Sequence, residues 1–238
     1  MDRNSATITD MADPTERRRR TRNSLSRDEV VQAAMRIADR DGLESLTFSN
    51  LGKELGAHKT AVYRYFQDKD ELLLTLVDTL QEEALRDFTP AEDWRETLRE
   101  HALRTRAVYM RHPQIGQRLA TRTARSEHEF RTVEIILSAL RSTGLPDAEV
   151  ARYYRVFDDF VLASASLEAA LAALDPQTRE RDLLAWRVDY PQVTADRYPT
   201  IAALAAHLPA LDDPANFELA LDLMLDSIEL RVEHHRRP

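Results

Sequence analysis

The sequence predicts an all-helical protein, and three features support that fold class. Only 5 of the 238 residues are glycine, whereas Ala, Leu, Arg and Glu, which favour helices, are abundant. Apolar residues recur every three or four positions through several long segments, which is the period of one helix face. Proline or Gly–Pro breaks separate those segments at Pro113, 144–146, Pro176, Pro191 and Pro209.

The composition excludes several classes of protein. The chain has no cysteine, which rules out disulfides, thiolate metal sites and cysteine nucleophiles. It has no apolar run of 18 residues, so no membrane span is expected. Residues 1–20 lack the apolar centre of a signal peptide. We therefore expect a cytoplasmic protein without a membrane partner.

Charge is distributed unevenly along the chain. Residues 17–69 hold 12 Lys/Arg against 7 Asp/Glu, a balance of +5, whereas the net charge of the whole chain is −8. The remainder therefore carries −13. A basic N-terminal part on an acidic body is typical of a DNA-binding head joined to a domain with another task. The alternative is a chance cluster of solvated charges.

The first helix is expected to follow a charged N-terminal arm. Residues 1–24 are polar and aperiodic, which predicts a disordered basic arm. Ser26 and Glu29 have the spacing of a capping box that opens a helix. Gly42 fits the position that ends it. This helix begins a domain predicted over residues 25–70.

Residues 47–66 have the pattern of a helix-turn-helix. Thr47 is placed to start a helix, and Leu51 and Leu55 lie one helical turn apart. Gly56 breaks the pattern where glycine most easily adopts a cramped or left-handed backbone.

The second helix of this motif is predicted over residues 58–65. Val62 and Phe66 resume the four-residue spacing, and core packing is the expected role of both. Such a helix can lie in a DNA major groove. Its free faces carry four side chains that can reach DNA: Lys59, Tyr63, Arg64 and Tyr65.

The remaining residues, 71–238, are predicted to form a second, larger helical domain. Asp68 and Glu71 have the spacing of another capping box, which opens a long helix ending near residues 89–90. Residues 188–198 are expected to be a loop. The other helices are predicted near 93–110, 113–120, 126–143, 147–174, 178–187, 199–207 and 214–235.

Two of these helices are apolar enough to pair with their copies in a second subunit. The last one has an apolar stripe of Phe217, Leu221, Met224, Leu225, Ile228 and Val232. The 147–174 helix has Phe157, Phe160, Val161, Leu167 and Leu171, with small residues at 163–166. A four-helix bundle between two protomers would use both stripes. The alternative is that both fill the core of one chain.

The helix-turn-helix and its flanks resemble the TetR family of bacterial transcriptional regulators from Ser26 to about Leu76. The matching positions are Ala34, Ile37, Ala38, Gly42, Leu46, Thr47, Leu51, Gly52, Leu55, Gly56, Tyr63, Tyr65, Phe66, Lys69, Leu72 and Leu73. The C-terminal part resembles the tetracycline-repressor branch at Trp94, Leu98, 119–122, 199–208 and 216–221. The resemblance implies a homodimer whose partners are an operator in double-stranded DNA and a small organic effector.

The family resemblance implies which side chains meet DNA. Lys can donate to guanine, Tyr hydroxyls suit phosphate oxygens, and a helix N-terminus such as that at Lys69 attracts a phosphate. His58 stands where the family often has Ser or Thr, so we expect Lys59 and Thr60 to carry sequence readout. The expected DNA-contacting residues of the motif are Thr47, His58, Lys59, Thr60, Tyr63, Tyr65 and Lys69.

The arginine run before the motif is a further candidate for DNA contact. Arg19, Arg20 and Arg22, with Arg17 and Arg18, can enter a minor groove or neutralise phosphates. The alternative is a solubilising tail.

The resemblance also implies an effector pocket in the larger domain. Polar anchors within apolar walls are what such sites need, although any one of these positions is as readily an ordinary helix-surface residue. The expected lining is Leu85, His101, Arg104, Thr105, Arg118, Thr121, Arg122, Val133, Phe157 and Asp158.

One departure from the tetracycline repressor bears on the ligand. That protein presents a histidine to drug-bound magnesium three places before the Thr of its Thr-Arg pair, and here that place holds Arg118. A metal ion would be repelled there. We therefore expect no metal, no cofactor and no magnesium–tetracycline recognition, and a different organic effector.

The sequence disfavours two other classes of function. An enzyme is disfavoured because His128-Glu129 lacks the second histidine of a metalloprotease helix, and because the chain has no Gly-rich phosphate loop. An architectural DNA binder without an effector would not need so large an acidic domain. The sequence thus predicts a ligand-responsive transcriptional regulator, most simply a repressor.

Overall fold

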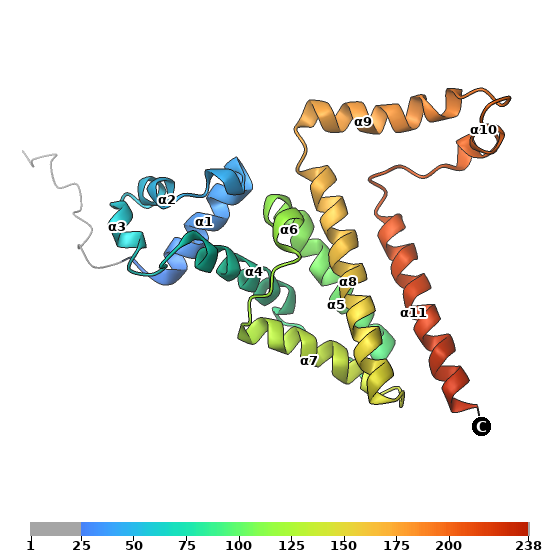
Figure 1. The fold of residues 1–238 in the computed structure, drawn as a ribbon, viewed down its shortest axis with the longest axis horizontal. Coiled ribbons are helices and arrows are strands. Elements are labelled where there is room, and N and C mark those ends of the chain that lie inside the picture. The colour runs from blue at the N-terminus through green and yellow to red at the C-terminus, as the bar shows by residue number, and fades with distance from the viewer. Residues whose placement is uncertain (1–24, 238) are drawn as a thin grey trace, which may run out of the picture.

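The computed structural model describes residues 25–237, and over this range the chain is helical and contains no strand (Figure 1). The predicted all-helical fold class is confirmed. The α-helices are α1 (Arg27–Asp41), α2 (Phe48–Glu54), α3 (Lys59–Val62), α4 (Lys69–Leu85), α5 (Trp94–Arg111), α6 (Pro113–Leu119), α7 (Glu127–Arg141), α8 (Asp147–Ala172), α9 (Pro176–Val188), α10 (Pro199–Leu204) and α11 (Ala215–Arg236). Short 3₁₀ turns η1 (Leu43–Ser45), η2 (Tyr190–Gln192) and η3 (Ala205–His207) complete the elements.

The predicted capping box of α1 is present. The Ser26 amide donates to Glu29 at 2.8 Å, and the Glu29 amide donates to the Ser26 hydroxyl at 3.1 Å. Two amides that the first helical turn leaves free are thereby satisfied. At α4 the predicted box is only half right: Asp68 accepts from the Glu71 amide, but the Glu71 carboxylate accepts from Gln67, one residue before the cap.

A close approach of two backbones makes the helix-turn-helix. Gly56 has a φ of +63°, a left-handed conformation that glycine adopts easily. A Cβ on Gly52 would lie 2.8 Å from the carbonyl oxygen of Ala57 and 3.0 Å from the amide nitrogen of Lys59. Only a residue without a side chain lets α2 meet the start of α3 at this distance.

The helix predicted over residues 58–65 is shorter than expected. It ends at Val62, and the Tyr65 and Phe66 amides then donate to the Val62 carbonyl in a tighter turn. Val62 and Phe66 are buried, as predicted. The turn forms because Phe66 has to enter the core between α1 and α4, where the Arg27 guanidinium lies 4.7 Å from its ring centre.

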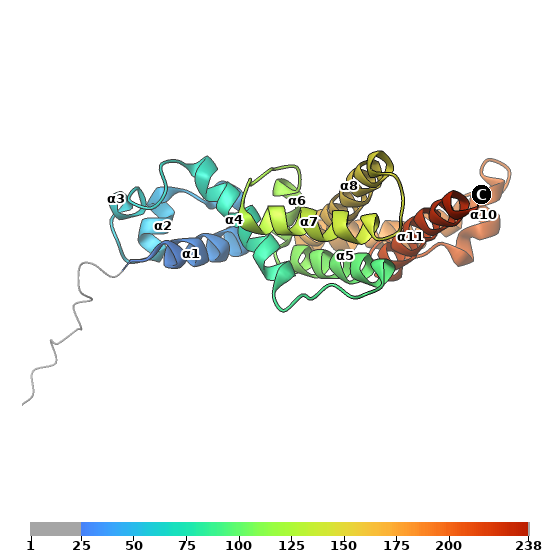
Figure 2. The same cartoon turned by 90° about the horizontal axis from the view of Figure 1, so that it is seen from below.

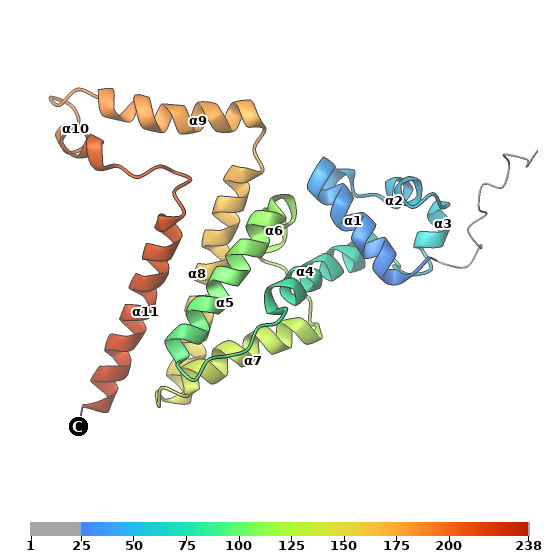
Figure 3. The same cartoon turned by 180° about the vertical axis from the view of Figure 1, so that it is seen from behind.

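The larger part of the chain packs around α8. Figures 1 and 3 show α5, α6, α7 and α11 beside this long helix, with α4 leading from the small helices into them. One apolar cluster joins Leu98, Leu140, Phe157, Phe217 and Leu225. Ion pairs bind α11 to α5, as in Arg95 with Asp226 at 2.5 Å and Arg99 with Glu218 at 3.2 Å.

The segment from α9 to η3 extends away from this body (Figure 1), and Figure 2 shows α10 at the end of the molecule opposite α3. Neither α9 nor α10 contains a buried residue. The segment is held internally, because the Trp186 indole donates to the Pro209 carbonyl at 2.7 Å and lies against Tyr190. Two predictions were inexact here: α9 begins at Pro176 rather than 178, and the expected loop 188–198 contains η2.

The apolar stripe predicted to pair α11 with a second copy is used inside the chain. Phe217, Leu221, Leu225, Ile228 and Val232 are all buried against α5 and α8. Within a single chain this face of α11 therefore fills the core, and any pairing with a second copy has to use another face of the helix. None of the described helices has the length and apolar character needed to cross a membrane.

Candidate nucleic-acid interface and effector cavity

The exposed side of the helix-turn-helix carries most of the residues predicted to meet DNA. His58, Lys59 and Thr60 are exposed at the start of α3, where His58 Nδ1 lies 3.0 Å from the Thr60 hydroxyl. Tyr63 is 55% exposed, and its ring packs edge-on against Phe48 at a centroid distance of 4.6 Å. This contact orients the ring and leaves more than half of the Tyr63 surface exposed.

Thr47 lies on the same motif and already has a structural task. Its hydroxyl oxygen accepts the Asn50 amide at 3.1 Å and so caps α2. The side chain is exposed, and its hydroxyl hydrogen remains available to an acceptor.

Two of the predicted DNA-contacting residues, the half-buried Tyr65 and the exposed Lys69, also bond to the backbone of the chain itself. The Tyr65 hydroxyl donates to the Leu25 carbonyl and the half-buried ring packs on the core, so the structure gives Tyr65 a structural position. Lys69 donates to the Leu43 carbonyl at 3.0 Å, which leaves part of its ammonium group for other acceptors. Arg19, Arg20 and Arg22 lie outside the described residues.

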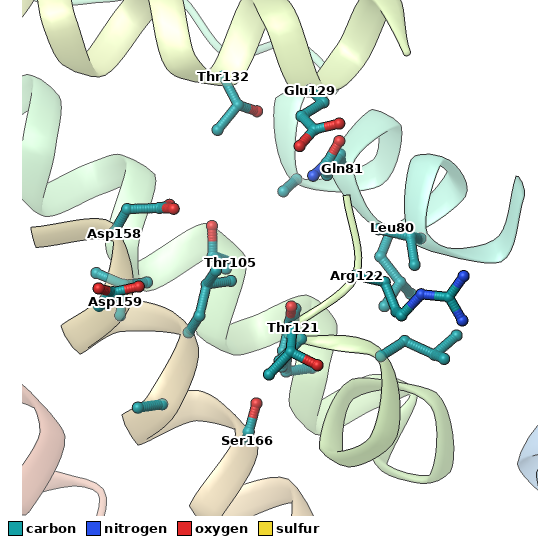
Figure 4. Close-up of a pocket in the computed structure, with 18 of the residues that line it drawn as sticks. Leu80, Gln81, Thr105, Thr121, Arg122, Glu129, Thr132, Asp158, Asp159 and Ser166 are labelled. Carbon is teal, nitrogen blue, oxygen red and sulfur yellow. The ribbon is translucent and has the colours of Figure 1, made fainter. Parts of the chain in front are cut away.

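A cavity of about 540 Å³ lies between α4, α5, α6, α7 and α8 (Figure 4). This volume is within the range of small-molecule sites. Seven of the ten residues predicted to line a pocket do line it: His101, Thr105, Arg118, Thr121, Arg122, Val133 and Asp158.

The other three predicted pocket residues lie elsewhere. Leu85 packs with Phe88 and Ile135 in a small separate cluster. Arg104 binds Glu100 at 2.6 Å and donates to the Arg86 carbonyl at 2.8 Å, on the outer side of α5. Phe157 is fully buried in the core beside α11. Leu85 was predicted by its match to the family pattern, Arg104 as a polar anchor and Phe157 as a residue of the later helix, and none of these criteria shows which helix face a residue occupies.

Two of the three arginines of the cavity wall, Arg118 and Arg122, are turned toward the helix-turn-helix part. Arg122 donates to both carboxylate oxygens of Asp70, at 2.7 and 2.9 Å, and Figure 4 shows its side chain directed away from the cavity. Arg118 donates to Glu44 in η1 at 2.8 Å. A wall of the cavity is thus bonded directly to the elements on either side of α2 and α3.

Histidines add two more links across this junction. His112, between α5 and α6, lies 2.8 Å from Asp39 of α1 and 3.1 Å from Glu83 of α4. His128 of α7 lies 2.9 Å from Asp78 of α4. Helix α4 is therefore in polar contact with the junction of α5 and α6 and with α7.

The polar groups inside the cavity are only partly satisfied. Burial lowers the pKa of His101 to about 4, so its ring is neutral, and its Nδ1 has no partner among the described residues. Burial raises the pKa of Asp158 to about 6, against a smaller opposing effect of Arg155. Gln81 Oε1 is also buried without a partner in this part of the chain.

The sequence did not reveal several lining residues. Gln81, Thr132 and Ser166 reach the cavity from three different helices. Glu129 also lines the cavity, although the sequence indicates it only as the neighbour of His128. None of these residues belongs to a recognisable sequence motif. Only the orientation of each helix, which the structure gives, shows that they line the cavity.

Two protein-family models match separate parts of the chain. Residues 30–76 match the family model described as bacterial regulatory proteins, tetR family, and residues 88–232 match the one described as tetracyclin repressor-like, C-terminal domain. The second match alone covers more than half of the chain. The chain belongs to the TetR family.

The similarity to known regulators extends over nearly the whole of this TetR-family chain. The HTH-type transcriptional repressor DrrR1 of Streptomyces coeruleorubidus is 30% identical over 90% of this chain and 80% of its own length. A possible TetR family transcriptional regulator from Streptomyces coelicolor A3(2) superposes with a TM-score of 0.70 at 27% identity, over 86% of this chain and 99% of the other. ActR of Streptomyces coelicolor, solved with (S)-DNPA, gives 0.69 at 25%, over 86% and 97%.

The predicted function class is confirmed by these matches: this TetR-family member is a helix-turn-helix transcriptional regulator, and its relatives are transcription factors rather than enzymes. Among the described residues no three metal-binding side chains gather into one group. Whether the predicted residues contact DNA and effector stays a prediction.

Proposed function

We propose that this protein is a homodimeric repressor that leaves a palindromic operator when a small organic molecule enters the cavity. The observation that carries the proposal is the pair of ion pairs from the cavity wall, Arg118–Glu44 and Arg122–Asp70, which join that wall to both sides of the helix-turn-helix. DrrR1 is named a repressor, and ActR was solved with an organic ligand, which supports this direction of control. The site of action is the cytoplasm, where the operator DNA lies.

DNA contact is assigned to the exposed end of the motif. His58, Lys59, Thr60 and Tyr63 stand free of the core, whereas Val62 and Phe66 anchor the segment from behind. Lys59 and Thr60 are placed to read base edges, and the Tyr63 hydroxyl to donate to a phosphate. Lys69 and Thr47 add backbone contacts with the donors that their internal bonds leave free.

The proposed dimer is supported by apolar side chains that a single chain leaves uncovered. On α11, Leu219, Leu223 and Leu230 are 62%, 59% and 66% exposed, and on α8 Val156 and Leu167 are 51% and 75% exposed. These residues lie on a different face from the stripe buried in the core. A second copy brought against α8 and α11 would cover them in a four-helix bundle, and a two-fold dimer suits a palindromic operator.

Release is a shift between two populations. Ligand contacts with α6 and with the residues that follow it act on Arg118 and Arg122, while contacts with Leu80 and Gln81 act on α4 directly. A ligand that binds one arrangement of these elements more tightly favours that arrangement. The two α3 helices of the dimer then move out of register with successive major-groove faces.

The experiment that tests the function is sequencing of genomic DNA fragments captured by the purified protein at moderate salt. Enrichment of one or a few inverted repeats is the expected result, and a folded Lys59→Ala/Tyr63→Ala variant should lose it. A folded dimer that enriches nothing would count against the proposal, provided mass spectrometry of the denatured protein finds no retained small molecule. A retained molecule would instead be removed by refolding before the capture is repeated.

A further inference from the structure

The cavity has an acidic end whose carboxylates lack cations. All three lining arginines are already engaged: Arg118 with Glu44, Arg122 with Asp70, and Arg155 with Asp159. By contrast, Asp158 makes no hydrogen bond or ion pair with any described residue, and Glu129 only accepts the backbone amide of Arg125. Figure 4 shows the side chains of Asp158 and Glu129 directed into the same space from opposite sides.

Two buried polar atoms without a partner line the same cavity. Gln81 of α4 has a buried amide oxygen without a partner, and His101 of α5, only 4% exposed, has an unpartnered Nδ1. Leaving such an atom unsatisfied costs about 1–3 kcal/mol. Because the imidazole is neutral, one ring nitrogen is an acceptor. The end of the cavity between α4, α5, α7 and α8 thus presents hydrogen-bond acceptors and negative charge, so a ligand that fits it has to supply hydrogen-bond donors.

The rest of the cavity is suited to an apolar body. Val77, Leu80, Val108, Val133, Val161 and Leu162 line it. Ser166, whose hydroxyl donates to the Gly116 carbonyl at 3.3 Å, marks the opposite end beside α6. Eight residues separate Asp158 from Ser166 on α8, which is about 12 Å along a helix. Arg118 belongs to the α6 end, so its charge is well separated from the acidic end.

We propose that the effector is an amphipathic organic cation, with a protonated amine between Asp158 and Glu129 and an apolar body toward α6. The ammonium would donate to these carboxylates and to Gln81 or His101, which satisfies the groups that the protein itself leaves open. The inference rests on the proposed function in that it names the chemistry of the effector. An anionic molecule would meet two carboxylates without any unpaired lining cation to offset them.

Three fluorescent probes with one body and different charges test the proposal. Dansylcadaverine carries a primary ammonium, its N-acetyl derivative is neutral, and dansyl-6-aminohexanoic acid is an anion. Fluorescence titration of the full-length protein at neutral pH should give a Kd for the ammonium probe at least about tenfold lower than for either other probe, which corresponds to about 1.4 kcal/mol. Equal affinities, no binding by any probe, or a preference for the neutral or anionic probe would overturn the proposal.

Matched variants locate the charge. Asp158→Asn should abolish the preference for the ammonium probe while keeping the binding of the acetylated one, and Glu129→Gln should reduce it. Glu134→Gln is the control, because Glu134 is an exposed carboxylate of α7 outside the cavity lining and its loss leaves Arg155 paired with Asp159, so the preference should persist. Thermal melting confirms that each variant is folded. An unchanged preference in folded Asp158→Asn would assign the selectivity to another site.

Operator binding separates this inference from the proposed function. If the ammonium probe binds selectively but does not change operator affinity, the ligand chemistry stands and the regulatory role of the cavity fails. If operator release is found only with the anionic probe, the regulatory role stands and the cation proposal fails.

Discussion

Arg122 and Asp70 form an ion pair between the wall of the cavity and the first turn of α4, with N–O distances of 2.7 and 2.9 Å. Asp70 comes one residue after Lys69, at the point where the chain leaves the helix-turn-helix. The pair is half exposed, so its own contribution to stability is about 0–1 kcal/mol. The pair matters for geometry, because it holds the residues after α6 against the start of α4, the helix that directly follows the helix-turn-helix.

The first prediction concerns this pair. Arg122→Gln and Asp70→Asn should change operator affinity by the same factor, and the double variant should change it no further, because each single change already breaks the link. Fluorescence anisotropy with operator DNA measures all three affinities. Additive effects would show that the two residues act separately. Arg187→Ala, on exposed α9, serves as a control that leaves affinity unchanged.

The second prediction concerns the turn of the motif. Gly52→Ala places a Cβ within 3.3 Å of three backbone atoms in Ala57 and Lys59, none of which can move without displacing α3. We expect a loss of about 1–3 kcal/mol in the free energy of unfolding, although alanine ordinarily favours a helix, and a weaker operator complex. Urea denaturation checks the stability. Ser49→Ala, exposed on the same helix, should stay within about 0.5 kcal/mol of the parent protein.

The third prediction separates base reading from charge. Lys59→Ala should weaken operator binding by about 1–3 kcal/mol, as expected for a lost base contact, and weaken binding to unrelated DNA much less. Tyr63→Phe should weaken both to a similar, smaller extent, since a phosphate contact carries no sequence information. Titrations at several salt concentrations with both DNAs provide the comparison. Equal losses on both DNAs for Lys59→Ala would make it a phosphate contact.

The fourth prediction tests the uncovered leucines. Leu223→Glu should convert the dimer into a folded monomer, because the side chain is 59% exposed in the single chain and a charge there costs little until a partner covers it. Sedimentation equilibrium gives the mass, and circular dichroism reports the helices. Phe130→Glu, at an exposed position on α7, should leave the dimer intact. A Leu223→Glu protein that remains dimeric would place the interface elsewhere.

How far the sequence predicted the fold can be traced to particular residues. Ser26, Gly42 and Asp68 marked helix ends because capping and glycine geometry are local. The 58–65 helix was drawn too long, because the burial of Phe66 against α1 is a tertiary effect that spacing does not encode.

The cavity was predicted less well for a related reason. His101 and Thr105 were predicted by their match to the tetracycline-repressor pattern, as was Leu85, which faces elsewhere. Asp158 and Phe157 were added from the later helix and only Asp158 lines the cavity, whereas Arg104, added as a polar anchor, does not. Helix rotation within the bundle decides which side chain lines the interior. The outward turn of Arg118 and Arg122 could not be read from the sequence either, since their partners lie 74 and 52 residues away.

The fifth prediction uses the pH dependence of stability. Burial raises the pKa of Asp158 from 3.8 to about 6 in the folded chain. The Asp158 carboxyl therefore binds its proton more tightly in the folded state than in the unfolded state. The stability that this protonated group contributes is lost as the pH rises from 3.8 through about 6. Around it lie Glu129, Arg155 and Asp159, together with Tyr109 and Tyr154, whose own pKa values are raised by burial and by this carboxylate.

Asp158→Asn removes the ionisable group and keeps its shape. At pH 8 the variant should be more stable than the parent protein, by on the order of 1–3 kcal/mol, and the difference should shrink toward zero below pH 4. Calorimetry of the unliganded protein at several pH values measures both. Glu134→Gln, at an exposed carboxylate of α7 outside the cavity lining, should show no such gain. An Asp158→Asn protein that is equally stable or less stable at pH 8 would mean that this carboxylate already has a partner, and the acidic end of the cavity would then have no open charge for a ligand to meet.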